Sequence, residues 1–210
     1  MKPASVIKSV LVEKKGTVAI VSLNRPEVLN ALNKEMLVEL NKELKALSLD
    51  EEITIIILKG NGNGFCSGGD IKSMFNLGNE KDFYGIMDCI NELAMAMYTM
   101  PKLTIAAVHG AAAGLGFSLA LATDCIIAEQ ESKLAMNFIG IGLIPDGGGH
   151  FFLERRLGEL KAQEVIWEGK VMSAEQALEI GLVDLVAKNS LEDEVQKRVK
   201  EWQAKPIQAM

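Results

Sequence analysis

The sequence predicts an α/β fold in a single folded unit. Short apolar runs rich in β-branched residues alternate with stretches whose apolar residues recur at helical spacing, which is typical of alternating strands and helices. Two of the apolar runs end in glycine-rich turns, and no linker-like change in composition divides the chain. With 210 residues, 49% of them hydrophobic, the chain is long enough to bury one substantial core.

A hairpin and a helix are predicted near the N-terminus. Residues 6–12 and 17–23 are β-branched runs on either side of Lys14-Lys15-Gly16, a sequence that favours a tight turn. Asn33 is expected to cap the first helix, because its side chain can accept a hydrogen bond from the first helical turn. The residues of that helix that recur at helical spacing are Met36, Leu37, Leu40, Leu44 and Leu47.

Two buried strands are predicted in the middle of the chain. Residues 53–58 are apolar on both faces, which indicates a central strand of a sheet rather than an edge strand. Residues 103–108 have the same character. The other elements expected here are helices over 82–100 and 115–123 and a strand over 124–129.

Serine and glycine mark the element boundaries in the last third of the chain. Ser173 and Ser190 are each expected to cap a helix, and Gly181 is expected to end the first of these two helices. The elements expected are a loop over 137–149, helices over 151–157, 174–180 and from Ser190 to about Gln203, and a strand over 182–186.

Charge and composition exclude several kinds of partner. The net charge of −6 is spread over both signs without a basic block, so we expect neither nucleic acid nor an anionic membrane surface as the main partner. The three cysteines lack metal-ligand spacing and the chain has only two histidines, so we expect no metal site. The N-terminus lacks the apolar core of a signal peptide, and no apolar stretch approaches the roughly 18–20 residues that span a membrane. We therefore expect a cytoplasmic location.

The two glycine-rich turns carry the strongest functional signal. Residues 65–72 (FCSGGDIK) follow the first buried strand, and residues 109–116 (HGAAAGLG) follow the second. If these turns lie at adjacent strand ends, the backbone N–H groups of Gly69 and Leu115 can converge on a carbonyl oxygen and stabilise an oxyanion. The alternative is a pair of tight connections that need glycine for the backbone alone. Neither turn matches a phosphate-binding loop or a dinucleotide-binding fingerprint.

Four motifs follow one another along the chain: NRPEVLNAL at 24–32, the turn at 65–72, the segment at 109–124 and IPDGGG at 144–149. A later stretch, SAEQALEIGLVDLV, occupies 173–186. In this order, and from about residue 17 to residue 186, the sequence resembles the crotonase family, the enoyl-CoA hydratase/isomerase group.

The resemblance implies a crotonase-like spiral of repeated ββα units and an acyl-CoA thioester as substrate. It makes the amides of Gly69 and Leu115 the donors to the thioester oxygen, and it implies no cofactor, since coenzyme A is part of the substrate. The residues that the resemblance assigns to substrate binding are Arg25, Val28, Gly68, Gly69, Asp70, Ile71, Lys72, Leu115 and Phe138.

The resemblance also suggests how the chain is organised. Residues 1–189 are expected to form the crotonase-like core, and residues 190–210 the start of a C-terminal helical region. Family members continue with further helices that help to close the site and build trimers, so we expect this region to be truncated here. A homotrimer or hexamer is expected where the region is present.

The positions of carboxylates separate the possible reactions. Hydratases of the family use two glutamates, which the resemblance aligns with Ser118 and Phe138. Asp146 stands where isomerases of the family carry their acid, and one carboxylate suffices for a 1,3-proton shift. Apolar surroundings are expected to raise the pKa of Asp146. The alternative is that Asp146 caps the helix after Gly149.

Three functions remain open from the sequence. The leading prediction is an enoyl-CoA double-bond isomerase of the single-aspartate branch, with Asp146 as the acid and base. The second is an enoyl-CoA hydratase that converts a 2-enoyl-CoA to a 3-hydroxyacyl-CoA. The third is an acyl-CoA-binding protein without catalytic activity.

Overall fold

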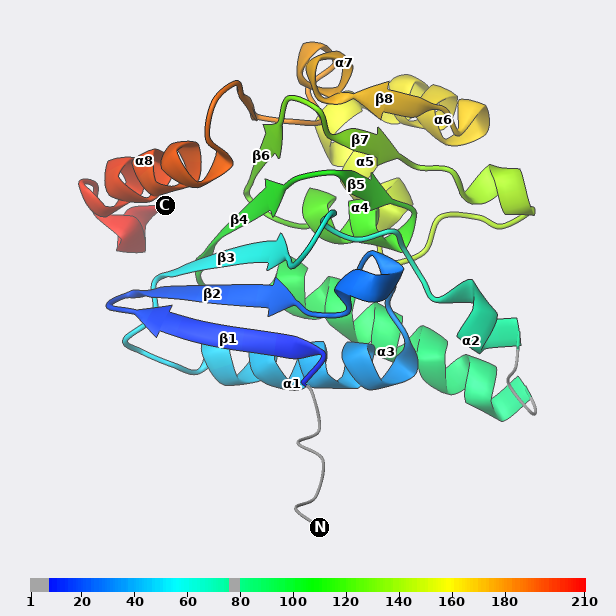
Figure 1. The fold of residues 1–210 in the computed structure, drawn as a ribbon, viewed down its shortest axis with the longest axis horizontal. Coiled ribbons are helices and arrows are strands. Elements are labelled where there is room, and N and C mark those ends of the chain that lie inside the picture. The colour runs from blue at the N-terminus through cyan, green and yellow to red at the C-terminus, as the bar shows by residue number, and fades with distance from the viewer. Residues whose placement is uncertain (1–7, 76–79) are drawn as a thin grey trace.

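A six-stranded sheet forms the centre of the molecule. The computed structural model describes residues 8–75 and 80–210, so part of the predicted strand over 6–12 lies outside the described residues. The strand order is β1-β2-β3-β4-β6-β9, in which β1 and β2 are antiparallel and the other neighbours are parallel (Figure 1). The strands are β1 (Val10–Lys15), β2 (Val18–Leu23), β3 (Ile55–Gly60), β4 (Leu103–Val108), β6 (Cys125–Glu129) and β9 (Leu185–Ala187).

A smaller sheet and eight α-helices surround this sheet in the described part of the chain. The second sheet has the order β5-β7-β8, from Ala111–Ala113, Lys133–Ala135 and Val171–Ser173. The helices are α1 (Lys34–Ser48), α2 (Ile71–Phe75), α3 (Glu80–Tyr98), α4 (Leu115–Leu121), α5 (Gly149–Leu157), α6 (Glu159–Glu168), α7 (Ala174–Glu179) and α8 (Leu191–Gln203). Short 3-10 turns lie at Pro26–Val28, Phe138–Ile141 and Ile207–Ala209.

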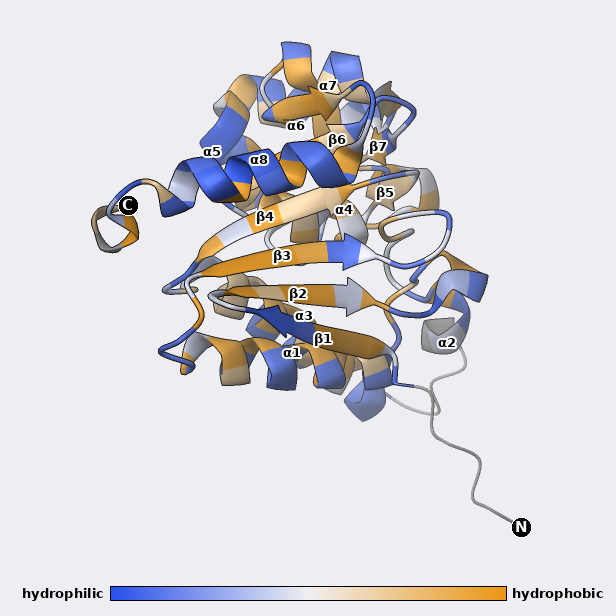
Figure 2. Ribbon diagram, turned by 60° about the vertical axis from the view of Figure 1, so that its left-hand side comes forward, coloured by the Kyte–Doolittle hydropathy of each residue, from blue (hydrophilic) through white to orange (hydrophobic). Residues whose placement is uncertain are grey.

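Both faces of the large sheet are buried. Along β3, Ile56 and Leu58 belong to the main core with α1 and α3, whereas Ile55 and Ile57 belong to a second core that α8 covers. Alternate residues of a strand point to opposite faces, so this division follows from the strand geometry. Figure 2 shows α8 lying across the sheet with its hydrophilic residues turned outward. The continuous apolar runs of the sequence therefore match a sheet that is covered on both sides.

The predicted N-terminal hairpin and first helix are confirmed, except that β1 runs on to Lys15, so that the turn lies at residues 16–17 instead of 14–16. The strands β1 and β2 pair in antiparallel register around Gly16, whose φ of 59° is one that glycine adopts without strain. The Asn33 side chain caps α1 by accepting a hydrogen bond from Met36 N at 3.0 Å. The five apolar residues predicted for this helix are all buried.

The predicted C-terminal elements are confirmed with one shift. Ser173 forms a reciprocal capping box with Gln176, and Ser190 caps α8. The predicted strand over 182–186 is wrong in its first part, since β9 begins only at Leu185. The N–H groups of Leu182 and Val183 instead bond to Ala177 O at 2.7 and 3.2 Å, which completes the end of α7.

Five short elements lie outside the sequence predictions: α2, α6, β5, β7 and β8. The predicted loop over 137–149 is confirmed except for the 3-10 turn at Phe138–Ile141 and the first residue of α5. Within the described residues, no helix is long and apolar enough to cross a membrane. The same part of the chain contains no cluster of three or more His, Cys, Asp or Glu side chains that could hold a metal ion. The domain boundary at residue 189 stays a prediction.

The cap of α8 gives a test of how this helix is held on the sheet. Ser190→Ala removes the hydrogen bond that Asp193 N donates to the serine hydroxyl at 3.1 Å, so we expect the free energy of unfolding to fall by about 1 kcal/mol. Urea denaturation followed by circular dichroism measures the change. The control is Ser48→Ala, whose hydroxyl bonds only to Lys45 O at the end of α1 and whose loss should cost less. Equal stabilities of the Ser190→Ala and wild-type chains would contradict the assigned cap.

Candidate active site

The two glycine-rich turns lie side by side, as the sequence predicted. A parallel backbone bridge pairs Cys66 of the first turn with Ala112 of the second. Cys66 N donates to Ala111 O at 2.9 Å, and Ala113 N donates to Cys66 O at 3.0 Å. The turns therefore meet through main-chain bonds that need no particular side chain.

Glycine is required where the two turns touch. Gly68 has a φ of 108°, and a Cβ there would lie 2.9 Å from Ala113 O and 3.6 Å from Leu115 N. A Cβ on Gly116 would lie 2.4 Å from Cys66 O and 2.7 Å from its Sγ, which excludes any larger residue. The start of α4 is thus packed directly on the first turn, and Leu115 N lies close to the residue before Gly69.

The amides of Gly69 and Leu115 are unused donors. Leu32 binds the residues on both sides of Gly69, because Leu32 N donates to Gly68 O at 2.8 Å and Asp70 N donates to Leu32 O at 2.9 Å. Within residues 8–75 and 80–210, neither Gly69 N nor Leu115 N donates a hydrogen bond to another protein group. Leu115 is the first residue of α4, where backbone N–H groups have no partner inside the helix. Two free N–H groups near one point are what an oxyanion site requires.

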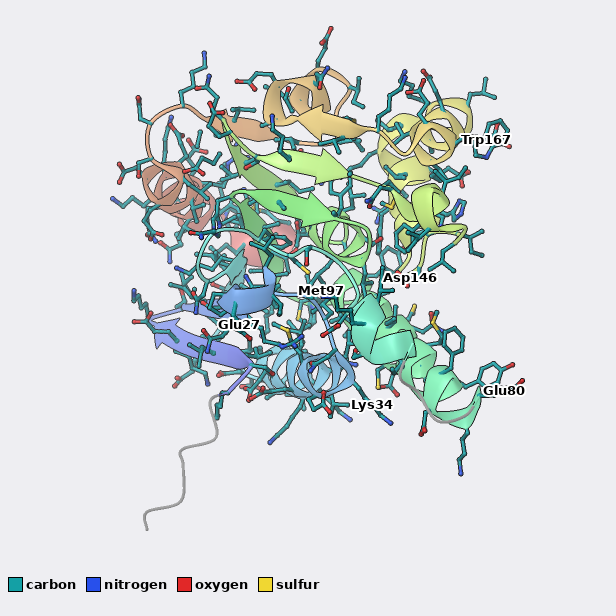
Figure 3. The ribbon with its side chains drawn as sticks, turned by 45° about the vertical axis from the view of Figure 1, so that its right-hand side comes forward. Glu27, Lys34, Glu80, Met97, Asp146 and Trp167 are labelled. Carbon is teal, nitrogen blue, oxygen red and sulfur yellow. The ribbon has the colours of Figure 1, made fainter. Side chains whose placement is uncertain are left out.

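Asp146 lies beside the second turn. It precedes Gly147, where a Cβ would lie 2.4 Å from Leu115 Cδ1, 3.4 Å from Ser118 Cβ and 3.8 Å from Ile90 Cγ2. Its loop is therefore packed against the first turn of α4 and the middle of α3; Asp146 is labelled in Figure 3. The structure brings the predicted acid to the same corner of the fold as the two free amides.

The Asp146 carboxyl is in an unusual electrostatic environment. Its Oδ1 atom is buried and has no hydrogen-bond partner among the described residues. Burial raises the pKa of Asp146 to about 6, and a hydrogen bond from its own backbone N–H offsets only part of the effect. The predicted direction of the shift is confirmed, and such a shift is typical of functional carboxylates.

The alternative role of Asp146 as a helix cap is wrong. The N-cap of α5 is Gly148, and no side chain caps this helix. Gly149 N donates to the backbone O of Asp146 at 2.9 Å, so a main-chain bond holds the turn and the carboxylate takes no part in it. A structural role as a cap therefore does not account for the aspartate.

Neutral side chains occupy both positions aligned with the hydratase glutamates. Ser118 is fully buried in α4, and its hydroxyl donates to Gly114 O at 3.4 Å. The Ser118 hydroxyl would also lie 2.8 Å from a Cβ on Gly149, so little space surrounds it. The ring of Phe138 lies 3.7 Å from a Cβ built on Gly114, the residue that precedes Leu115. The corner beside Leu115 thus has a neutral lining from Phe138, Ser118 and Asn137, whose Oδ1 lies 3.9 Å from a Cβ built on Gly114.

The residues predicted to line a coenzyme A groove divide into two groups. Arg25 Nη1 and Asp70 Oδ2 form an ion pair at 3.1 Å, and Arg25 also donates to Ala31 O. Asp70 Oδ1 accepts a hydrogen bond from Ser73 N at 3.2 Å, near the start of α2. The residues of the other group are exposed: Val28, Ile71 and Lys72.

Three other candidates are explained without catalysis. Cys66 lies beside the first donor, but burial raises the pKa of its thiol to about 12, which disfavours the nucleophilic thiolate. His109 Nε2 lies 2.9 Å from Gly62 O, which confirms that it bonds to a loop. His150 is exposed.

Sequence reasoning missed two residues that shape the site. Leu32 acts through its backbone, which bonds to the residues on both sides of Gly69. Because any residue type can supply these backbone groups, the sequence gives no sign of this role. Ile90, in the helix predicted over 82–100, belongs to the core and also lies against the Asp146–Gly147 turn. Helical spacing predicts that such a residue is buried, but it does not predict that the residue packs against the turn at Gly147.

Comparison with known proteins agrees with this geometry. The family model described as enoyl-CoA hydratase/isomerase matches residues 13–210. The putative enoyl-CoA hydratase/isomerase YhaR of Bacillus subtilis is 51% identical over 169 residues, 80% of this chain and 66% of that protein. The 1,2-epoxyphenylacetyl-CoA isomerase of Escherichia coli is 36% identical over 197 residues, 92% of this chain and 75% of that protein. The chain thus spans about two thirds to three quarters of the length of these relatives.

The fold is also shared with solved structures. The enoyl-CoA hydratase of Bacillus anthracis superimposes with a TM-score of 0.90 at 29% identity, over 95% of this chain and 78% of that chain. This likeness confirms the predicted crotonase-like α/β fold. The chain belongs to the enoyl-CoA hydratase/isomerase family.

Proposed function

We propose that the chain is an enoyl-CoA isomerase that moves a carbon–carbon double bond with Asp146 as its single acid and base. The observation that carries this proposal is the partly buried Asp146 carboxyl, whose buried Oδ1 has no partner among the described residues and whose loop packs on Leu115 through Gly147. Neither position 118 nor position 138 carries a carboxylate. Gly69 N and Leu115 N are the donors to the thioester oxygen. Coenzyme A is part of the substrate, and no further cofactor is needed.

The chemistry is a 1,3-proton shift. The Asp146 carboxylate removes a proton from the α-carbon of a β,γ-enoyl thioester, and the electron pair moves through the carbonyl to give a dienolate. The two amides bind the oxygen that carries the charge, and each such donor contributes roughly 10²–10³ in rate. The protonated acid then returns the proton to the γ-carbon, which leaves the double bond in conjugation. No atom is gained or lost, and no second acid is required.

Hydration is the second candidate, because structures named enoyl-CoA hydratase share this fold. A hydratase must hold and activate a water molecule as well as stabilise the enolate. The Ser118 hydroxyl is bonded to Gly114 O, and Phe138 offers only a ring, so neither supplies a base. Asp146 alone would have to do both tasks. An acyl-CoA-binding protein without activity is the third candidate, and it gives no reason for an unpartnered buried acid.

The remaining predictions concern coenzyme A binding, oligomeric state and cellular location. We propose that coenzyme A lies along Arg25, Val28 and residues 68–72, with Phe138 against the acyl group. The apolar side chains at 139, 141, 143 and 144 are between 47% and 79% exposed, which is consistent with a surface covered in a homotrimer or hexamer. The assembly and the cytoplasmic location stay predictions.

The central test replaces the acid. Asp146→Asn keeps the shape of the side chain but cannot accept the proton, so conversion of a β,γ-enoyl-CoA to the conjugated isomer should fall by about 10²–10⁴-fold. The absorbance of the conjugated thioester measures the rate. The matched control is Asp88→Asn on the exposed side of α3, which should retain the wild-type rate.

Two outcomes would contradict the assignment. Full isomerase activity in Asp146→Asn would remove the proposed acid. Wild-type protein that incorporates ¹⁸O from water into crotonyl-CoA faster than it isomerises would instead indicate a hydratase. Exchange of α-protons for deuterium in heavy water, faster than in buffer alone, excludes the binding-protein candidate.

The pH dependence of the reaction follows from the same carboxyl. Asp146 must be ionised to act as a base, and its pKa is raised to about 6. We expect kcat/KM for isomerisation to rise about tenfold per pH unit below this value and to level off above it. Initial rates between about pH 4.5 and 8 measure the profile. A rate that is flat over this range would contradict Asp146 as the base.

The same carboxyl should lower stability at neutral and alkaline pH. Folding raises the pKa of Asp146 from its ordinary value of 3.8 to about 6, so between these pH values the folded chain binds more protons than the unfolded chain. The free energy of unfolding therefore falls as the pH rises through this range, because above it the buried carboxyl is charged. Asp146→Asn should therefore be more stable than wild type by up to about 3 kcal/mol near pH 8. The difference should shrink as the pH falls towards 4, where Asp146 is protonated. Urea denaturation at both pH values measures it, and a difference independent of pH would contradict the charge as its cause.

A further inference from the structure

We propose that Asn30 is a positioning residue of the oxyanion site, which it holds in shape without touching the substrate. This inference rests on the proposed function, because it assigns a task within the same site. Asn30 is fully buried, with no exposed surface, so it acts only through its protein neighbours. It belongs to the segment between β2 and α1, more than thirty residues before the first glycine-rich turn.

The side chain of Asn30 is hydrogen-bonded at both its oxygen and its nitrogen, and the two N–H groups of Nδ2 lie within reach of three carbonyls. Its Oδ1 accepts a hydrogen bond from Arg25 N at 2.9 Å. Its Nδ2 donates to Asn61 O at 2.9 Å, to Gly64 O at 2.8 Å and to Phe65 O at 3.2 Å. These carbonyls belong to the loop that leads from β3 into the first turn. A single amide therefore ties that loop to the segment after β2.

The backbone around Asn30 holds the next part of the first turn. Residues 29–32 and 66–70 run alongside each other and exchange four contacts. These are Ser67 N to Leu29 O at 2.9 Å, Cys66 Sγ to Asn30 O at 3.1 Å, Leu32 N to Gly68 O at 2.8 Å and Asp70 N to Leu32 O at 2.9 Å. Because the bonds of Leu32 take up the groups on both sides of Gly69, the Gly69 amide is left free.

The backbone conformation explains why asparagine suits this position. Asn30 has a φ of 56° and follows Leu29, whose φ is 50°. Asparagine is among the few residues other than glycine that adopt this left-handed conformation readily. The conformation turns the side chain inward to the three carbonyls while its own carbonyl meets the Cys66 thiol. Residue type, backbone conformation and hydrogen bonding at this position are mutually consistent.

The consequence for catalysis is geometric. Phe65 and Cys66 pair with the second turn through Phe65 N to His109 O at 2.8 Å and Cys66 N to Ala111 O at 2.9 Å. The loop that Asn30 binds is continuous with this pairing, so a shift of the loop moves Gly69 N relative to Leu115 N. Donors of an oxyanion site must be held within a fraction of an ångström to be effective. Asn30 should therefore affect the turnover step far more than substrate affinity.

The test uses Asn30→Gly, which keeps the left-handed backbone accessible and removes the whole amide. We expect kcat for isomerisation to fall by about 10- to 100-fold, with KM changed less than about threefold. The pH profile should keep its shape, because Asp146 is untouched. Acetoacetyl-CoA gives a second readout independent of turnover: the fraction bound as its enolate, measured by ultraviolet absorbance at fixed pH, should fall to a similar extent. Ser190→Ala is the control for a general loss of stability and should change none of these quantities.

The outcomes for Asn30→Gly distinguish a positioning role of Asn30 from its absence. Loss of kcat and of bound enolate in Asn30→Gly, with folding confirmed by circular dichroism, supports the proposal. Wild-type values in a folded Asn30→Gly, or a change in KM alone, would overturn it. If Asn30→Gly does not fold, the milder Asn30→Ser, which supplies one hydroxyl, takes its place. Its kcat and bound enolate fraction must then lie below the wild-type values. Wild-type values in Asn30→Ser would also overturn the proposal. If the wild-type chain itself neither isomerises nor binds the enolate, the proposed function fails and this inference with it.

Discussion

The backbone bridge between Cys66 and Ala112 is the contact on which the rest of the site depends. It joins two turns that follow β3 and β4, neighbours in the parallel sheet, and it sets Gly68 against Leu115 N. Gly68 and Gly116 allow the turns to approach to distances at which a Cβ would collide with the opposite backbone. The burial of β3 and β4 on both faces fixes these strands, and through them the relative positions of the two free amides.

The environment of Asp146 illustrates the tension between stability and function. A buried carboxyl with an oxygen that lacks a partner is unfavourable for folding, and native proteins satisfy most such atoms. Here the same burial raises the pKa of the acid, and low polarity strengthens hydrogen bonds to any negative charge nearby. A solvated aspartate would be a weaker base, because its pKa would lie near the ordinary value. The cost to folding and the advantage for the proposed proton transfer thus have one physical cause.

Sequence reasoning predicted the elements whose local signals are strong. The helix α1 has a capping asparagine and five apolar residues at helical spacing, and β4 is a continuous apolar run, so both are recognisable from their own residues. The strands β5, β7 and β8 have three residues each and form because of their partners, and α6 buries only Ala162 and Ile166. In the site, glycine spacing indicated the two turns. The contacts of Asn30 and Leu32 join segments more than thirty residues apart, and no local pattern encodes which carbonyl such a residue will meet.

The division of labour in the site explains how one fold can host different reactions. The groups proposed to bind the oxyanion are backbone amides, so their placement depends on glycines and on the pairing of turns rather than on catalytic side chains. The proton chemistry depends on a few side chains around them, at positions 118, 138 and 146, and these can change without disturbing the bridge. Of these three positions, two carry serine and phenylalanine, and only the third, Asp146, carries an acid. A single acid is sufficient to move a proton between two carbons of one substrate, whereas hydration also requires a group that positions and activates water. The side chains at these three positions can therefore select the reaction while the backbone amides stay in place.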